Sequence, residues 1–263
     1  MIITLLTDFG TSDAYVAAMK GVILSLAPKA ELVDACHNIA PQDVQAAAWT
    51  LGQYWSLYPK NTLHVAVVDP GVGTQRDILL VLADDYLFLV PDNGLLTFVL
   101  KQAQKVRLRK LKADVHRRGE VSATFHGRDI FAYAAGLLAG GRADVAALSE
   151  ETSSVVVPSW AVVREDRGCL LGEVVHVDHF GNLITNITRR QMEEHAGGTR
   201  AVSAGTFDNI PLKQTYGDAS LGELIALFGS SDTLEIAIAG GSATTKTGLL
   251  RGATVVVGQC DVK

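Results

Sequence analysis

The 263-residue chain is poor in cysteine, and its cysteines form no recognised pattern. Cys36, Cys169 and Cys260 are far apart in the sequence, with no CxxC pair and no Cys/His spacing of the zinc type. This excludes a small disulfide framework and a structural zinc site of known spacing. Free thiols are therefore expected, as in most cytosolic proteins.

The sequence also lacks long apolar runs and a surplus of positive charge. No apolar run approaches the roughly 20 residues of a membrane-spanning helix, and the N-terminal residues reach Asp8 without the basic segment of a signal peptide. The 23 Lys and Arg against 28 Asp and Glu give a net charge of −5, which argues against a broad surface for nucleic acid. We expect a soluble, cytoplasmic protein.

Short apolar runs alternate with stretches of helical periodicity in residues 1–155. This alternation predicts an N-terminal α/β domain, in which a mostly parallel sheet is flanked by helices. Asp84 and Asp85 are expected to join two of its strands. Strands are expected at 2–6, within 31–39, within 62–71 and, as a pair, within 78–94; helices are expected within 7–30, 40–60 and 127–141, the last packed closely through small residues.

The pattern changes after about residue 150. Residues 153–160, "SSVVVPSW", are typical of a connector. Beyond it, short apolar runs separated by turns predict a smaller, β-barrel-like C-terminal domain at 165–263. Its strands are expected within 168–187, 234–240 and 252–258, and only "SLGELIALFG", residues 220–229, is typical of a helix.

Polar side chains follow three of the predicted strands of the first domain. These are Asp8, Asp69, and the pair Asp92 and Asn93. Ligands of open α/β sheets bind at the carboxyl ends of the strands, so these residues are candidates for one site. Each is also ordinary turn chemistry, because Asp-Pro-Gly and Pro-Asp-Asn-Gly both favour turns.

Two further stretches add candidate groups to this domain. Residues 65–76, "VAVVDPGVGTQR", are glycine-rich and place Arg76 after the turn, but they lack the lysine and hydroxyl of a phosphate-binding P-loop. "TFHGRDIF" places His126, Arg128 and Asp129 just before a predicted helix. A lone histidine is usually structural, and Asp129 is also suited to support a helix N-terminus.

The second domain carries its own polar clusters. "HVDHFGNLITNI" places Asp178, His179, Asn182 and Asn186 around a turn, and the Asn182 amide matches a purine edge as well as it suits a turn. The stretch "FGSSDTLEIAIAGGSA" sets the polar turn at Ser230 before a strand that carries Glu235. An outward Glu in such a strand is normally a solvated residue.

Six of these stretches, in this order, resemble the S-adenosyl-L-methionine (SAM) hydroxide adenosyltransferase family, whose relatives include the fluorinases and chlorinases. The resemblance extends from about residue 3 to residue 257. It is carried by "LLTDFGTSDAYVAAMKG", "VVDPGVGTQR", "VPDNGLL", "TFHGRDIFA", "VDHFGNLITNI" and "LEIAIAGGSA". It implies a homotrimer with active sites between subunits, no cofactor, and the reaction of SAM with water to give adenosine and L-methionine.

The resemblance also assigns roles to individual residues. It implies a catalytic set of Asp69, Arg76 and His126, which the halogenases lack. The substrate-binding positions that it implies are Asp8 for the ribose, Asp178 near the methionine ammonium, Asn182 at the adenine, and Ser230, Glu235 and Ile238 around the purine. Two departures from the family pattern concern nucleoside packing: Gln42 stands where the halogenases stack a tryptophan, and Gly241-Ser242 replaces a glycine-asparagine pair.

The chemistry of this reaction fits the residues. Water must approach C5′ in line with the carbon–sulfur bond, and orientation of this kind lowers a barrier by several kcal/mol. Arg76 and His126 are suited to donate hydrogen bonds to developing hydroxide, while Asp69 orients the pair and can also hold a ribose hydroxyl. Because the sulfonium is a cation, carboxylates must outweigh Arg76; Asp8, Asp13, Asp69 and Asp178 are the candidates.

Three other functions stay open from the residues alone. The first is halide-dependent adenosyl transfer. The second is a metal-dependent phosphoesterase, since Asp8, Asp69, His126 and Asp129 are all of metal-ligand type, although no HxD or DxD motif supports it. The third is a non-catalytic adenosine- or SAM-binding protein, which would not need Arg76 and His126.

Overall fold

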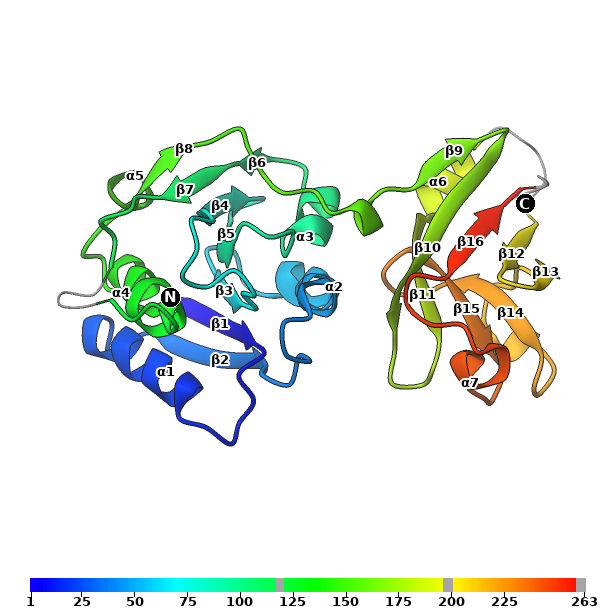
Figure 1. Cartoon of the computed structure of the whole chain (residues 1–263), viewed down its shortest axis with the longest axis horizontal. Coiled ribbons are helices and arrows are strands. Elements are labelled where there is room, and N and C mark those ends of the chain that lie inside the picture. The colour runs from blue at the N-terminus through cyan, green and yellow to red at the C-terminus, as the bar shows by residue number, and fades with distance from the viewer. Residues whose placement is uncertain (117–120, 196–200, 259–263) are drawn as a thin grey trace. The chain divides into compact units, whose positions relative to one another are not determined.

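The computed structural model describes residues 1–116, 121–195 and 201–258. The chain divides into two compact units, Met1–Val157 and Pro158–Lys263 (Figure 1). Each unit has hydrophobic clusters of its own, so each is built around a separate core.

The first unit contains a sheet flanked by helices. Its strands are β1 (Ile2–Thr7), β2 (Glu31–Cys36), β3 (Leu63–Val67), β4 (Ile78–Ala83), β5 (Tyr86–Pro91), β6 (Val106–Arg107), β7 (Arg109–Leu111) and β8 (Ser149–Glu151). The order is β2-β1-β3-β5-β4-β7-β8, with β6 also paired to β4. The strands β2, β1, β3 and β5 are parallel, and β4, β7 and β8 extend the sheet antiparallel. The prediction of a mostly parallel sheet with helices is confirmed.

Helices cover both faces of this sheet. They are α1 (Tyr15–Leu26), α2 (Val44–Tyr54), α3 (Thr97–Gln102), α4 (Ala132–Ala139) and α5 (Val145–Leu148). In Figure 1, α1 and α4 lie together on one side of the strands and α2 and α3 on the other. Successive strand residues face opposite layers: Leu5 packs in the cluster that contains α1 and α4, and Leu6 in the cluster that contains α2.

Local sequence chemistry explains two of these features. Asp84 and Asp85 both adopt left-handed φ values, of 46° and 70°, so the β4–β5 hairpin turns in two residues as expected. A Cβ placed on Gly136 of α4 would lie 2.9 Å from the Leu26 side chain of α1. The close packing predicted for the small residues of this helix is therefore present.

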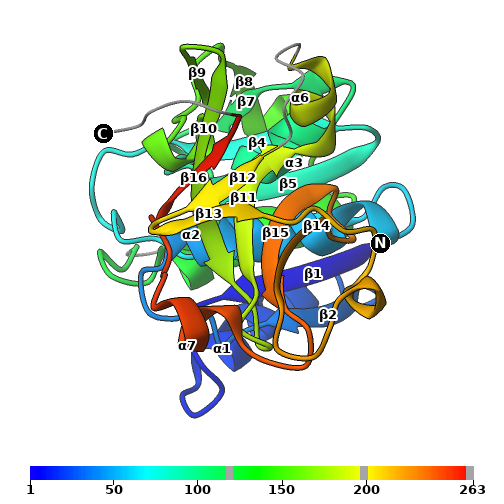
Figure 2. The same ribbon diagram turned by 90° about the vertical axis from the view of Figure 1, so that its right-hand side faces the viewer.

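The second unit is an antiparallel, nearly closed barrel. Its elements are β9 (Arg164–Asp166), β10 (Cys169–Val177), β11 (Leu183–Thr188), α6 (Arg189–Glu194), β12 (Val202–Ala204), β13 (Phe207–Ile210), β14 (Leu224–Phe228), β15 (Thr233–Ile238), α7 (Ala243–Thr247) and β16 (Thr254–Val257). The strand order is β13-β12-β16-β10-β11-β15-β14, and Figure 2 shows β10, β11 and β15 within it. A bridge between Leu212, just after β13, and Ala226 of β14 brings the two ends of the sheet together.

The predicted helix at 220–229 is wrong. This segment forms β14, which pairs with β15 along its whole length, from Leu224 opposite Ile238 to Phe228 opposite Leu234. Its central residues are buried on both faces, so the apolar run has no alternation to reveal a strand. The short helices α6 and α7 are unpredicted; α6 begins at a capping box of Thr188 and Gln191.

The expectation of free thiols holds for Cys36 but is wrong for Cys169. Cys36 is a free thiol, whereas Cys169 is disulfide-bonded. Leu170 of β10 pairs with Val257 of β16, so Cys169 lies where the chain leaves the last strand. Spacing along the sequence does not reveal this proximity. Cys260 lies outside the described residues.

In the described ranges, no helix combines the length and the apolar character that crossing a membrane requires.

Candidate active site

Asp8 and Asp69 lie at the carboxyl ends of two neighbouring parallel strands. Asp8 directly follows β1, and Asp69 follows β3 after one residue. Because β1 and β3 pair in parallel, both carboxylates reach the same edge of the sheet. They line one cavity of about 530 Å³ together with Phe9, Tyr15, Pro41, Gln42, Val67, Pro70, Val72, Thr124, Phe125, His126 and Gly127.

The third polar strand end has a structural role. Asp92, after β5, accepts a hydrogen bond from the Val156 amide at 2.8 Å, and the Asn93 side chain donates to the Val68 carbonyl at 2.9 Å. Neither residue lines the cavity beside Asp69. Asp92 and Asn93 therefore support the chain around the site.

Arg76 is paired with Asp69 in a two-pronged arrangement. The Arg76 Nε lies 2.9 Å from both Asp69 carboxylate oxygens, and Nη2 also donates to Oδ2. Both side chains are largely buried, with 12% of Arg76 and 5% of Asp69 exposed. A bidentate guanidinium–carboxylate pair fixes both groups in orientation as well as in charge.

The glycines between Asp69 and Arg76 allow this loop to fold tightly. Gly73 has a φ of 79°, and a Cβ on it would lie only 2.6 Å from the Ala123 carbonyl oxygen. A larger residue would push the loop away from the segment that precedes His126. The glycine-rich stretch at 65–76 therefore brings Arg76 and His126 within reach of each other.

His126 accepts a hydrogen bond from Arg76. The Nη2 of Arg76 lies 3.2 Å from His126 Nδ1, and a guanidinium can only donate. The imidazole must therefore be unprotonated at Nδ1, with its proton on Nε2. Burial and the Arg76 charge lower the pKa of His126, while Asp69 and Asp129 oppose that shift. The structure thus favours a neutral histidine with Nε2 as its donor.

Asp129 supports this segment from behind. Its side chain is fully buried and accepts two hydrogen bonds from Arg128, both at 2.7 Å, and one from the Ser122 amide at 2.9 Å. The Arg128 guanidinium in turn lies over the ring of Phe125, 5.1 Å from its centre. Asp129 thus ties together the two ends of the segment that carries Phe125 and His126.

Asp8 is held by an unusual backbone position. The Gln42 amide donates to Asp8 Oδ2 at 2.7 Å, and Gln42 adopts a left-handed φ of 66°. A non-glycine residue in that region is strained and persists where its surroundings require it. The strain here directs an N–H at a carboxylate in the cavity.

The sequence analysis does not predict the aromatic wall of this cavity. The rings of Phe9, Tyr15 and Phe125 are in mutual contact, with centre-to-centre distances of 5.8, 6.0 and 5.1 Å. Tyr15 is 49% exposed although it begins α1. The available signal is an aromatic residue at the start of a helix, just after a polar stretch.

The second unit has its own cavity, of about 750 Å³. Asp178 Oδ1 accepts from the amides of Phe180 and Asn182, at 2.9 and 2.8 Å, and its Oδ2 accepts from the Asn182 side chain at 2.9 Å. Asn182 is 6% exposed, so its amide is oriented by Asp178 and still lines the cavity. Ser230, Glu235 and Ile238 line the same cavity.

Glu235 is not the solvated strand residue that its pattern suggests. It is 7% exposed and accepts a hydrogen bond from the Tyr216 hydroxyl at 2.9 Å. A Cβ on Gly229 would overlap its carboxylate, so glycine is needed there. Burial raises the pKa of Glu235, and Asp178 adds to the shift. Tyr216 begins a short 3-10 helix, Tyr216–Asp218, in a polar stretch without periodicity, so the sequence carries no signal for its role.

Both cavities are acidic. Asp8 and Asp69 line the first, Asp178 and Glu235 line the second, and no lysine or arginine in the described part of the chain lines either. Such surroundings suit a cationic ligand. No group of three or more His, Cys, Asp or Glu among the described residues is arranged to hold a metal ion, and Asp69 and Asp129 are instead paired with arginines.

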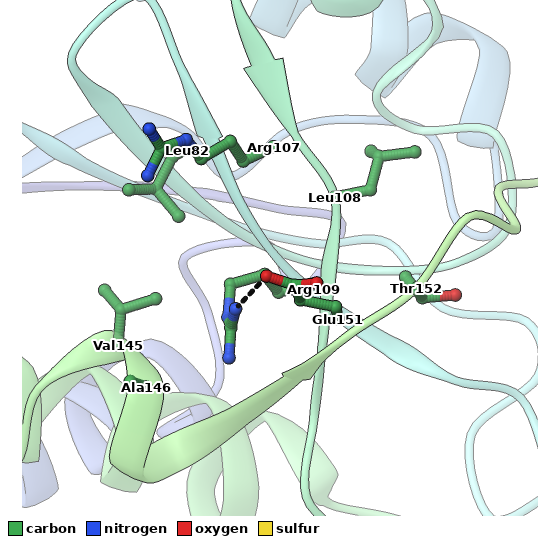
Figure 3. Close-up of a pocket in the computed structure, with 8 residues that line it drawn as sticks. All are labelled: Leu82, Arg107, Leu108, Arg109, Val145, Ala146, Glu151 and Thr152. Atoms are coloured by element: carbon green, nitrogen blue, oxygen red, sulfur yellow. Dashed lines mark hydrogen bonds and ion pairs between the residues drawn. The ribbon is translucent and has the colours of Figure 1, made fainter.

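A separate cavity of about 520 Å³ lies beside β7 and β8 of the first unit (Figure 3). Two arginines line it, Arg107 and Arg109. Arg109 donates to the side chain and the carbonyl of Ser149, each at 2.8 Å, and pairs with Glu151 at 3.4 Å. None of the predicted site residues lines it.

Comparison with known proteins assigns both units. The model of the SAM hydroxide adenosyltransferase N-terminal domain matches residues 3–148, and that of the C-terminal domain of the same name matches residues 172–256. These two matches together cover most of the chain.

Individual relatives and a solved structure agree with these matches. The chain is 36% identical over 255 residues to an (R)-S-adenosyl-L-methionine hydrolase of Salinispora tropica, covering 95% of each chain. A fluorinase of Nocardia brasiliensis is 27% identical over 294 residues, covering 97% of this chain and 96% of the relative. The crystal structure of an uncharacterised conserved protein from Thermotoga maritima superposes with a TM-score of 0.83 at 29% identity, covering 98% of this chain and all of that one.

Proposed function

The chain belongs to the SAM hydroxide adenosyltransferase family, and from this premise we propose that it hydrolyses SAM to adenosine and L-methionine. The observation that carries the proposal is the set of Asp69, Arg76 and His126 at the edge of the parallel sheet. Water attacks C5′ of the ribose, the C5′–O bond forms and the C5′–S bond breaks. Sulfur keeps the electron pair as the neutral thioether of methionine, and the water proton passes to solvent.

The charges around the cavities support a sulfonium substrate. Arg76 is the cation of the catalytic set, and Asp69 neutralises it directly. Asp8 then leaves the first cavity with surplus negative charge, to which Asp178 and Glu235 add in the second. As the attacking oxygen gains hydroxide character and approaches the sulfonium, the two opposite charges neutralise each other. A site that excludes water favours that step.

We assign separate tasks to the three catalytic residues. His126 donates from Nε2 to the attacking oxygen, because its Nδ1 is occupied by Arg76. Arg76 holds Asp69 and His126 in place and stabilises developing hydroxide by its charge. Asp69 fixes the guanidinium and reaches a ribose hydroxyl, while Asp8 binds the ribose from the neighbouring strand end. The Salinispora relative is named for the (R) epimer, and we propose the same preference here.

The proposed assembly is a homotrimer. In it, each active site combines the first unit of one chain with the second unit of a neighbour. The distribution of groups supports this, because the catalytic set lies in the first unit and the amide and carboxylates suited to a nucleoside and an ammonium lie in the second.

Asn182→Ala should weaken nucleoside binding by about 1–3 kcal/mol, the usual cost of leaving buried polar groups unpaired. The amide of Asn182 is oriented by Asp178 and lines the second cavity, where we place the purine. Isothermal titration of adenosine measures the change. Asn186→Ala is the control, because that side chain donates to the Trp160 carbonyl and does not line the cavity. An unchanged adenosine affinity in the Asn182 variant would remove the assignment.

The pH dependence of turnover should show an acid limb below the ordinary histidine pKa of about 6.5. The neutral form of His126 is the active one, and burial together with Arg76 lowers its pKa. Activity is thus retained as the pH falls to about 6.5 and is lost only as it falls further, through the lowered pKa. Adenosine release measured across pH tests this. An acid limb centred above pH 7, or the same limb in His126→Gln, would contradict it.

A further inference from the structure

His37 is a buried histidine that lines neither the catalytic cavity nor the nucleoside cavity. It directly follows β2 and is 6% exposed. Its Nδ1 lies 2.8 Å from the Thr7 hydroxyl, and its Nε2 lies 2.9 Å from Asp34 Oδ1. Both ring nitrogens are thus engaged, by residues on two neighbouring strands.

The partners of His37 give the hydrogen bonds a direction. The Asp34 carboxylate can only accept, and its other oxygen accepts from Lys20 at 2.6 Å. Burial opposes ionisation of Asp34, but the hydrogen bonds from His37 and Lys20 hold its pKa below the usual range. His37 Nε2 is therefore the donor to Asp34. In the neutral imidazole, Nδ1 accepts a hydrogen bond from the Thr7 hydroxyl. The Thr7 oxygen in turn accepts the Phe9 amide at 3.2 Å.

This chain of hydrogen bonds ends on the loop that carries Asp8. Phe9 is held through Thr7, and the Gly10 amide donates to the His37 carbonyl at 2.8 Å. Asp8, just before them, accepts from the Gln42 amide. The loop of residues 8–10 is thus tied at each residue to the segment 37–42 or to Thr7, which His37 orients.

We propose that His37 is a positioning residue, which fixes Asp8 and Phe9 for the ribose by linking Thr7 to Asp34. It does so without contacting the cavity. This inference rests on the proposed function, in which Asp8 binds the ribose. Because such a contact is made in the ground state and in the transition state alike, its loss raises KM and leaves kcat nearly unchanged.

Two near-isosteric variants separate the two hydrogen bonds of His37, to Thr7 and to Asp34. The amide of asparagine occupies the place of Nδ1 and keeps a partner for Thr7, whereas the amide of glutamine occupies the place of Nε2 and keeps the partner for Asp34. We expect His37→Gln to raise the KM for SAM about tenfold, with kcat within about threefold, as for one or two lost hydrogen bonds. His37→Asn should stay closer to the wild-type KM.

Three outcomes would overturn the proposal: wild-type KM in both variants, an equal rise in both, or a fall in kcat at unchanged KM. If neither variant folds, Asp34→Ala keeps the test open, because the Asp34 side chain is 46% exposed and its removal takes away the acceptor of His37 Nε2, which should still raise KM about threefold. A wild-type KM in that variant would then count against the proposal.

Amide hydrogen exchange separates this inference from the proposed function. If the wild-type protein releases no adenosine from SAM, the proposed function fails. The positioning role of His37 can still be measured, since the amides of Phe9 and Gly10 should exchange faster in His37→Gln than in His37→Asn. Equal exchange in the two variants would overturn the positioning role of His37, whatever the activity.

Discussion

Arg76→Ala should slow the release of adenosine from SAM by about 100-fold or more, the usual loss when a preorganised donor is removed from an active site. The guanidinium holds both Asp69 oxygens and donates to His126 Nδ1. Without it, the Asp69 carboxylate is left buried and unpaired, which adds a cost of its own. Chromatographic assay of adenosine under substrate saturation measures the effect.

Two further arginine variants show whether charge alone suffices. Arg76→Lys keeps the positive charge but loses the planar fork that bridges Asp69 and His126, so it should remain at least about tenfold slow. Arg109→Ala is the matched control, since Arg109 is also partly buried and ion-paired but lines a separate cavity. Near-normal turnover by a folded Arg76→Ala protein would end the assignment of Arg76.

His126→Ala should cause a comparable loss of about 100-fold. The structure leaves Nε2 as the donor of this imidazole, because Nδ1 accepts from Arg76. His126→Gln places an amide near Nε2, and His126→Asn places one near Nδ1. If donation from Nε2 stabilises hydroxide, glutamine should retain more activity than asparagine.

The opposite order would show that His126 serves mainly to hold Arg76. Equal, near-normal rates in all three variants would remove His126 from the mechanism. Asp69→Ala belongs to the same series and is expected to lose about as much as Arg76→Ala, because each removes one half of the same pair.

The placement of Asp8 and Asp69 could be predicted because the rule for parallel sheets is geometric. A strand pattern followed by a carboxylate places that carboxylate at the ligand-binding edge, and β1 and β3 are neighbours. The same pattern also selected Asp92, which supports Val156 instead. Sequence alone does not distinguish the two cases, because which side chain turns toward a cavity depends on tertiary packing.

Residues that act through tertiary contacts cannot be predicted from the sequence alone. His37 follows a strand and resembles any loop histidine until Thr7 and Asp34 are brought beside it. Tyr216 begins a one-turn 3-10 helix, Tyr216–Asp218, in a polar stretch without periodicity. Glu235 lies on a strand that is buried on both faces, so the expectation of a solvated side chain is wrong. The helix predicted in place of β14 is wrong for the same reason: burial on both faces removes the alternation that marks a strand.

Hydrolysis of SAM in water enriched in oxygen-18 tests the central claim most directly. If water primed by Asp69, Arg76 and His126 displaces the thioether at C5′, the adenosine formed carries one solvent oxygen as its 5′-hydroxyl, and methionine is unlabelled at sulfur. Mass spectrometry of the two products reads this out. Adenosine without the label, or adenine in place of adenosine, would contradict attack of water on C5′.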